Sequence, residues 1–501
     1  MVKKGLPLIL AMAIPCCYLL WLTAIWGVGG TPDSANYLAV ARGFCQDGSL
    51  QITGNRELLW WPPLYPISWG LALKLGLADF RAAQILNLVS LAAFALGCQR
   101  LCFRFLTIQF AWIAWFALVL SLAPMRIFAQ ALSEPGFLAL SIWALYFQIR
   151  AHSESNRSCL VLAICITAAA CLWRYLGVVL IFSGAAAFFL CRSFSNKRFT
   201  LFAIWILATA TPLTAWLLRN WWISNTLTGV RPKGALGILG NTQALGIAAY
   251  DWLFNSTTHS FDPALFLSMT GTLLVLGLAW AFRESLLPTL RSSLENPAFT
   301  LPWVFALSYL VLFLILSSAT LTTKPNTRLL APMASPALFG GLIFLQTLCT
   351  IQSKTIPKKW LTAFTIFILC LCAYGLFLGM HERQEGWGAR NRSWQTSATM
   401  EWAATHDSAG LKMYCNMRQE LYLNTMVPAS GLPRTFEKFR LLAAQLSKTG
   451  GIIVWSNLPA EMRRPYNWQD VKALFPSQIP IQLEDGWILQ IPKPERHPSS
   501  P

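Results

Sequence analysis

The chain has 501 residues, of which 55% are hydrophobic and only 12% are charged. A soluble enzyme carries about twice that charged fraction, and 23 Trp and 31 Phe are too much apolar surface for a disordered chain. The net charge of +18 could suggest nucleic acid, but basic residues of a membrane protein more often record its orientation. We therefore expect an integral membrane protein with no nucleic-acid partner.

Apolar stretches of about 20 residues, long enough to cross a bilayer, recur along the chain. About eleven spans are expected, at 5–28, 82–103, 106–124, 132–149, 158–173, 175–191, 199–222, 263–282, 300–319, 329–349 and 360–380. Arg174 interrupts the run 158–191, which could instead be one broken span.

The positions of the charges orient these spans. With a cytoplasmic N-terminus, every turn expected inside is basic, from Arg100 and Arg104 to Lys358 and Lys359. This is the positive-inside pattern. It places outside the membrane the loop 29–81, the loop 223–262 and the C-terminal segment 381–501.

Two domains follow from this arrangement. Residues 1–380 form the membrane domain, and its first outside loop contains interfacial helices, with Trp60, Trp61 and Trp69 expected in the headgroup layer. Residues 381–501 change character, with strand-like runs at 451–455 and 486–491 and a helix-like run at 436–447. They predict a small water-soluble α/β domain.

Polar residues recur at the outer ends of the spans. Asp33 follows the first span and precedes a helical pattern, where the dipole favours an acid, so it could be a simple helix-terminal residue. Glu134 opens the fourth span. The cations near the outer ends are Arg174, Arg219, Arg231, Lys233, Lys324 and Arg328. Singly, each arginine could extend to the interface; together they suit a phosphate or diphosphate beside the two acids.

Several motifs resemble the bacterial polytopic glycosyltransferases of the GT-C superfamily. They are PDSANYLAVAR, WPPLYP, ALSEPGFLAL, LWRYLGVVL and PLTAWLLRNWWISNTLTGVRP, in that order. In the tail, KMYCNMRQELYLNTMVPASGLPR and GGIIVWSN resemble the periplasmic domain of such proteins. The resemblance implies an α-helical polytopic membrane bundle with a small C-terminal α/β domain, in the inner (plasma) membrane of a bacterium, with the C-terminal domain extracytoplasmic.

The function implied by the resemblance is that of an inverting glycosyltransferase, similar to protein O-mannosyltransferases and lipid A aminoarabinose transferases. A hexosyl or pentosyl residue would move from a polyprenyl-phosphate-linked donor to a hydroxyl of a lipid, glycan or protein acceptor on the extracytoplasmic face. Asp33 matches the general base by position, and Glu134 is the second acid expected at the site. The six cations are expected to bind the donor phosphate, with Arg219 and Arg328 ranked first. The substrate-lining candidates are Tyr37, Tyr65, Tyr175 and Asn220.

The sequence also departs from the better-known relatives. Many have two adjacent acids in the first loop, whereas position 34 is Ser34. We therefore expect no cofactor, although a divalent metal bound with help from Asp47 and Glu134 stays open. Leu329 replaces the tyrosine of an Arg-Tyr-Leu-Pro pattern, which weakens the transfer of a role to Arg328.

Two other functions remain open at this point. One is a transporter or flippase of a lipid-linked or anionic solute, although internal repeats and midplane charges are not evident. The other is a non-catalytic assembly subunit of a cell-envelope glycan system, which the missing second acid would explain.

Overall fold

The computed structural model describes residues 8–191, 194, 197–234, 236–254, 286–320, 325–351, 358–406, 410–458 and 465–494. They form two compact units. Unit 1 comprises Met1–Leu22, Leu58–Ser68 and Arg81–His381, and unit 2 comprises Thr23–Glu57, Trp69–Phe80 and Glu382–Pro501. Much of the expected first outside loop therefore shares a compact unit with the C-terminal segment.

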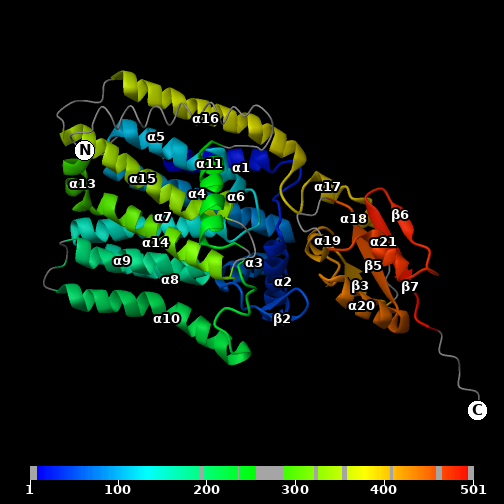
Figure 1. Ribbon diagram of the computed structural model, residues 1–501. Coiled ribbons are helices and arrows are strands. Elements are labelled where there is room, and N and C mark those ends of the chain that lie inside the picture. The colour runs from blue at the N-terminus through cyan, green and yellow to red at the C-terminus, as the bar shows by residue number, and fades with distance from the viewer. Residues whose placement is uncertain are drawn as a thin grey trace, which may run out of the picture. The chain divides into compact units, whose positions relative to one another are not determined.

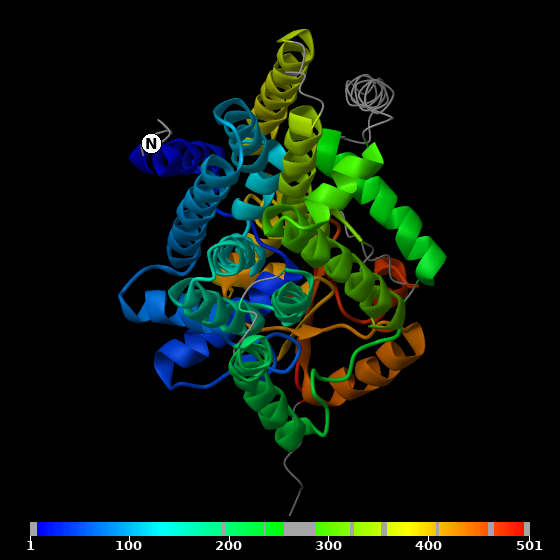
Figure 2. The ribbon, with the colours of Figure 1, turned by 90° about the vertical axis from the view of Figure 1, so that its left-hand side faces the viewer.

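Unit 1 is helical. Its helices are α1 (Leu8–Leu22), α4 (Asp79–Phe105), α5 (Ile108–Val119), α6 (Leu122–Phe128), α7 (Glu134–Glu154), α8 (Arg157–Trp173), η1 (Tyr175–Gly177), α9 (Val178–Leu190), α10 (Arg198–Ser224), α11 (Ile238–Phe254), α13 (Leu286–Leu294), α14 (Pro297–Thr320), α15 (Thr327–Ile351) and α16 (Lys358–Glu385). Helix α3 (Leu64–Lys74) contributes residues to both units, as do the first two residues of α4 and the last four of α16. Figure 1 shows α8, α9, α10 and α14 running side by side, and Figure 2 views the teal helices nearly end-on.

Several of these helices can cross a membrane. Among the described residues, five are long and apolar enough, or six if α5 and α6, bent by 45°, form one span. The protein is therefore an integral membrane protein. The count of about eleven spans stays a prediction, and the expected span 263–282 lies outside the described residues.

Arg174 separates two helices. It ends α8 in an extended conformation (φ −149°, ψ 138°), and the 3-10 turn η1 then leads into α9. The buried Gln148 of α7 donates to Thr167 Oγ1 of α8 (3.5 Å) and to the Leu180 carbonyl of α9 (3.2 Å). Because residues on either side of the break reach the same side chain, the chain reverses direction at Arg174.

Trp69 does not have the exposed side chain expected of a residue in the headgroup layer. Its side chain is buried, and its indole Nε1–H donates to the Asp79 carbonyl (2.8 Å) within unit 2. A buried indole needs such a partner for its one donor, and here the backbone supplies it. Trp60, in unit 1, is 38% exposed.

Unit 2 contains a five-stranded sheet. Its strands are β3 (Met413–Cys415), β4 (Ser430–Gly431), β5 (Gly451–Ser456), β6 (Ile481–Leu483) and β7 (Gly486–Ile491), and its order is β4-β3-β5-β7-β6. The pairs β4–β3 and β3–β5 are parallel, and β5–β7 and β7–β6 are antiparallel. The expected strands 451–455 and 486–491 are β5 and β7.

Helices cover both faces of this sheet. They are α17 (Arg392–Gln395), α18 (Ala398–Thr405), α19 (Arg418–Thr425), α20 (Phe436–Thr449) and α21 (Trp468–Ala473). One face packs Ile453 and Leu489 against Phe439 of α20, and the other packs Val454 and Ile488 against Leu421 of α19. All six residues of β5 are buried, as in a strand covered on both sides. Unit 2 also contains α2 (Pro32–Gln46) and the hairpin β1 (Gln51–Ile52) and β2 (Arg56–Glu57).

The reversal at Arg174 generates a stability prediction. A Cβ on Gly177 would lie 2.6 Å from the backbone of Ala170, whereas one on Gly341 of α15 would meet no atom within 4 Å. We expect Gly177→Ala to cost about 1–3 kcal/mol through overpacking and Gly341→Ala to leave stability unchanged or slightly raised. Thermal midpoints of the two variants in detergent test this. Equal midpoints would mean that α8 and α9 are not packed as described.

Candidate functional site

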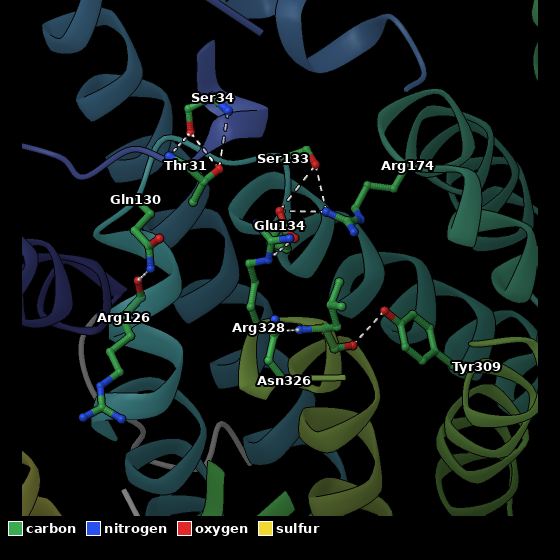
Figure 3. Close-up of polar contacts among 11 residues, drawn as sticks. Thr31, Ser34, Arg126, Gln130, Ser133, Glu134, Arg174, Tyr309, Asn326 and Arg328 are labelled. Atoms are coloured by element: carbon green, nitrogen blue, oxygen red, sulfur yellow. Dashed lines mark hydrogen bonds and ion pairs between the residues drawn. The ribbon is translucent and has the colours of Figure 1, made fainter. Parts of the chain in front are cut away.

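Glu134, the first residue of α7, is a buried carboxylate between two arginines of unit 1 (Figure 3). Its side chain is 2% exposed, Oε2 lies 2.7 Å from Arg174 Nη1, and Oε1 lies 3.2 Å from Arg328 Nε. Arg174 Nη1 also donates to Ser133 Oγ (2.9 Å). We call Ser133, Glu134, Arg174 and Arg328 the Glu134 cluster.

Close packing of α7 on the end of α8 brings Arg174 to Glu134. Trp173, the last residue of α8, donates its indole N–H to the Ser133 carbonyl (2.7 Å). Its ring lies where a Cβ on Gly136 would be, only 2.3 Å away, so this approach needs a glycine. The Ser-Glu-Pro-Gly sequence at the start of α7 therefore supplies the carboxylate and also the space for its neighbour.

Two contacts fix Arg328 at the start of α15. Asn326 Oδ1 accepts the Leu329 N–H (3.2 Å), as a residue before a helix commonly does. Tyr309 of α14 is buried and donates its hydroxyl to the Leu329 carbonyl (3.0 Å). The start of α15 is thus held by its own preceding residue and by the neighbouring helix.

The Glu134 cluster carries a net charge of +1, because one carboxylate meets two guanidiniums. The arginine side chains are still 16% (Arg174) and 21% (Arg328) exposed. A partly exposed guanidinium pair with excess positive charge suits a phosphate oxygen. Glu134, in contrast, is engaged by both arginines, which fits a role in positioning them. The catalytic role expected of Glu134 stays a prediction.

A second polar cluster holds the backbone of residues 58–60 in unit 1. The Tyr175 hydroxyl donates to the Leu59 carbonyl (2.9 Å) and accepts from Trp216 Nε1 (3.1 Å) and Asn220 Nδ2 (3.2 Å). Arg219 Nη1 donates to the Leu58 carbonyl (2.9 Å). We call this group, together with Arg231, the Tyr175 cluster.

Arg231 completes the Tyr175 cluster by donating to the Trp60 carbonyl (2.6 Å). Arg219 also stacks on Trp216, 4.6 Å from the ring centroid. Four predicted site residues thus meet in space, and their observed partners are one another, backbone carbonyls and an indole. Phosphate binding by Arg219 and Arg231 stays a prediction.

The remaining predicted residues are not among the members that define these two clusters. Asp33 is the second residue of α2 in unit 2 and is half-buried. Tyr37 is buried in unit 2, and Tyr65 is buried in unit 1 with its ring centroid 5.7 Å from that of Trp173. Lys233 is exposed, and Lys324 lies outside the described residues.

A capping box fixes the start of α2. Thr31 Oγ1 accepts the Ser34 N–H (3.4 Å), and Ser34 Oγ accepts the Thr31 N–H (2.9 Å). Ser34, which stands where many relatives have a second acid, is therefore part of the cap. The arrangement sets Asp33 in the first turn, where the helix dipole stabilises a carboxylate.

A metal site would need several ligands close together. Among the residues that the structure describes, no group of three or more His, Cys, Asp or Glu side chains could hold an ion. Asp47 is solvent-exposed, and the Ser49 N–H that it accepts (2.8 Å) lowers the pKa of its carboxyl. Metal independence stays a prediction.

Sequence reasoning assigned no role to two contributors to the site. Ser133 precedes Glu134 and contacts Arg174, and a Ser-Glu-Pro start of a helix is a recognisable signal. Tyr309 lies within an apolar span among other aromatic residues, so no local pattern distinguishes it from a packing residue.

Comparisons with known proteins establish the fold. No protein-family model and no curated protein matches the chain. The crystal structure of ArnT from Cupriavidus metallidurans bound to undecaprenyl phosphate matches with a TM-score of 0.60 at 13% identity, covering 98% of this chain and 99% of ArnT. Apo ArnT from the same organism matches with a TM-score of 0.51 at 13% identity, covering 96% of this chain and 97% of ArnT.

A third structure widens the comparison. The archaeal oligosaccharyltransferase AglB from Archaeoglobus fulgidus, in complex with an inhibitory peptide and a dolichol-phosphate, matches with a TM-score of 0.53 at 9% identity. The match covers 89% of this chain and 69% of AglB. The GT-C resemblance indicated by the sequence motifs is thereby confirmed for the fold: the chain has the fold of GT-C membrane glycosyltransferases.

The two ends of α7 allow a matched test of the buried charges. Glu134 pairs with two arginines at 2% exposure, and Glu154 pairs with Arg104 and Arg150 at 25% exposure. Glu134→Gln leaves two guanidiniums without their carboxylate and should cost about 3–5 kcal/mol. Glu154→Gln should cost less than about 1 kcal/mol.

Thermal unfolding of both variants in detergent measures the difference. A midpoint for Glu134→Gln equal to that of Glu154→Gln would show that the Glu134 cluster is not the buried ion-pair arrangement described.

Proposed function

We propose that this chain is an inverting glycosyltransferase that moves a sugar from a polyprenyl-phosphate-linked donor to an acceptor hydroxyl on the extracytoplasmic face. The observation that carries the proposal is the fold match over 98% of the chain to ArnT, a protein crystallised with undecaprenyl phosphate. AglB, which has the same type of fold, was solved with a dolichol-phosphate. Both ligands are polyprenyl phosphates.

The proposed reaction is a single displacement. The acceptor oxygen forms a bond to the anomeric carbon from the face opposite the leaving group, and the bond from that carbon to the phosphate oxygen breaks. The bonding pair leaves with the polyprenyl phosphate, and the acceptor hydroxyl gives its proton to a general base. Inversion at the anomeric carbon follows from this geometry.

Arg174 and Arg328 are the proposed phosphate-binding groups. Negative charge grows on the phosphate as the glycosidic bond breaks, and guanidiniums already held in place stabilise it without reorganisation. Glu134 contributes by fixing both arginines while leaving the Glu134 cluster with a net charge of +1. These three residues come from the start of α7, the α8–α9 reversal and the start of α15.

Asp33 is the proposed base. A base must be ionised before it accepts a proton, and the first turn of a helix favours the carboxylate form. The capping box of Thr31 and Ser34 holds this turn in place. The proposal invokes no cofactor and leaves the acceptor as a lipid, glycan or protein hydroxyl.

Removing the base tests the catalytic assignment. Asp33→Asn keeps the size of the side chain but cannot accept the proton, so transfer should fall by about 10²–10⁴-fold. The measurement is sugar incorporation from a radiolabelled polyprenyl-phosphate donor by membranes that contain the variant. Asp47→Asn, at an exposed acid after the same helix, is the control and should keep wild-type activity. Near wild-type transfer by Asp33→Asn would exclude Asp33 as the base.

The phosphate assignment has its own test. Arg328→Gln removes a charge-assisted contact and should lower kcat/KM for the donor about ten- to hundredfold. Arg150→Gln removes an arginine paired with Glu154 at the opposite end of α7 and should leave kcat/KM unchanged. Both variants are compared by donor kinetics at equal amounts of folded protein. An unchanged kcat/KM in Arg328→Gln would remove this arginine from the donor site.

A further inference from the structure

Unit 2 contains a cavity of about 440 Å³ beside the start of α18. Its volume falls within the range of pockets that bind small molecules. The wall is mainly polar and includes Arg390, Gln395, Thr396, Ser397, Glu401 and Asn424, with Trp394 beside them. This cavity belongs to a different compact unit from the Glu134 cluster and takes no part in the proposed transfer reaction.

Arg390 is a confined cation in this wall. Its guanidinium lies 3.5 Å from the centroid of the Phe80 ring, and Nη1 is 3.5 Å from the Val28 carbonyl oxygen. Within the described part of the chain, no carboxylate forms an ion pair with it, and its Nε has no hydrogen-bond partner. Burial lowers the pKa of Arg390 to about 10, and the charge of Asp79, which forms its ion pair with Arg42, offsets part of this effect. The side chain is thus held in a position where an anion would compensate its charge.

Asn424 supplies an acceptor in the same wall. Its Nδ2 donates to the carbonyls of Ala389 (2.8 Å) and Glu420 (2.8 Å), which fixes the orientation of the amide. Its Oδ1 is buried and, among the described residues, accepts no hydrogen bond. A buried acceptor without a donor is costly. A ligand hydroxyl can satisfy either Asn424 Oδ1 or the Arg390 guanidinium, because it donates to an amide oxygen and accepts from a guanidinium.

The remaining wall residues narrow the ligand class. Glu401 places a carboxylate on the same cavity, which disfavours a small ion of high negative charge but can accept hydrogen bonds from hydroxyls. The side chains at 395–397 also line the cavity, but they are already engaged with the backbone: Gln395 donates to the Trp26 and Arg390 carbonyls, Thr396 donates to the Arg392 carbonyl, and Ser397 accepts the Met400 N–H. A molecule with one acidic group and several hydroxyls satisfies this set of donors and acceptors better than a bare anion does.

We propose that this cavity binds an acidic saccharide, with its carboxylate or phosphate at Arg390 and its hydroxyls at Asn424 and Glu401. The site goes beyond the proposed transfer reaction, and its occupancy needs no donor and no turnover. Binding and transfer can therefore succeed or fail independently.

Titration of the full-length protein in detergent tests the ligand class. The probes are glucuronate and glucose 6-phosphate as acidic sugars, glucose as the neutral sugar, and inorganic phosphate as the anion without hydroxyls. At least one acidic sugar should bind at least tenfold more tightly than glucose and inorganic phosphate. The acidic sugar that binds more tightly shows whether the site prefers a carboxylate or a phosphate. Absence of binding by both acidic sugars, or equal binding of inorganic phosphate, would overturn the proposal.

Three variants locate the binding. Arg390→Gln should weaken the acidic sugar at least tenfold, and Arg390→Lys should restore part of the affinity. Arg392→Gln, at a side chain 59% exposed, is the matched control and should bind as wild type. Glu401→Gln replaces the carboxylate that accepts from the hydroxyls with a weaker, neutral acceptor and should weaken binding, which keeps the test decisive if Arg390→Gln does not fold. Unchanged affinity in both Arg390→Gln and Glu401→Gln would place the ligand elsewhere.

Discussion

The helical bundle of unit 1 depends on one buried charge arrangement, the carboxylate of Glu134 between Arg174 and Arg328. A buried charge is tolerated only when its partners are complete, so the elements that carry these residues must meet in one way. The ion pairs join the start of α7, the reversal after α8 and the start of α15. Tyr309 connects α14 to the same arrangement by its hydrogen bond to the Leu329 carbonyl.

Charged groups with proposed roles lie at the starts of helices in both units. Asp33 is in the first turn of α2, Glu134 begins α7, and Arg328 is the second residue of α15. At such positions the backbone still has unpaired N–H groups, and side chains such as Thr31, Ser34 and Asn326 order the turn. The sites are therefore supported by local capping as well as by long-range ion pairs.

Local patterns predicted the features that depend on neighbouring residues. The strand-like runs predicted β5 and β7, and Arg174, where the sequence left either one broken span or two spans open, lies at the break between α8 and α9. Contacts between residues far apart in the sequence left no recognisable pattern in it. The backbone carbonyls that hold Arg219 and Arg231 and the stacking of Arg390 on Phe80 depend on tertiary structure alone. Trp69 is buried for the same reason: its partner carbonyl is brought to it by the fold.

A structure of the full-length protein determined with undecaprenyl phosphate tests the donor class and the site together. The proposed function predicts density for the phosphate within hydrogen-bond distance of the guanidinium of Arg174 or Arg328, with the isoprenoid chain continuing from it. Phosphate density at a place remote from both guanidiniums, or no bound lipid at saturating concentration, would contradict the proposal that the Glu134 cluster receives a polyprenyl-phosphate donor.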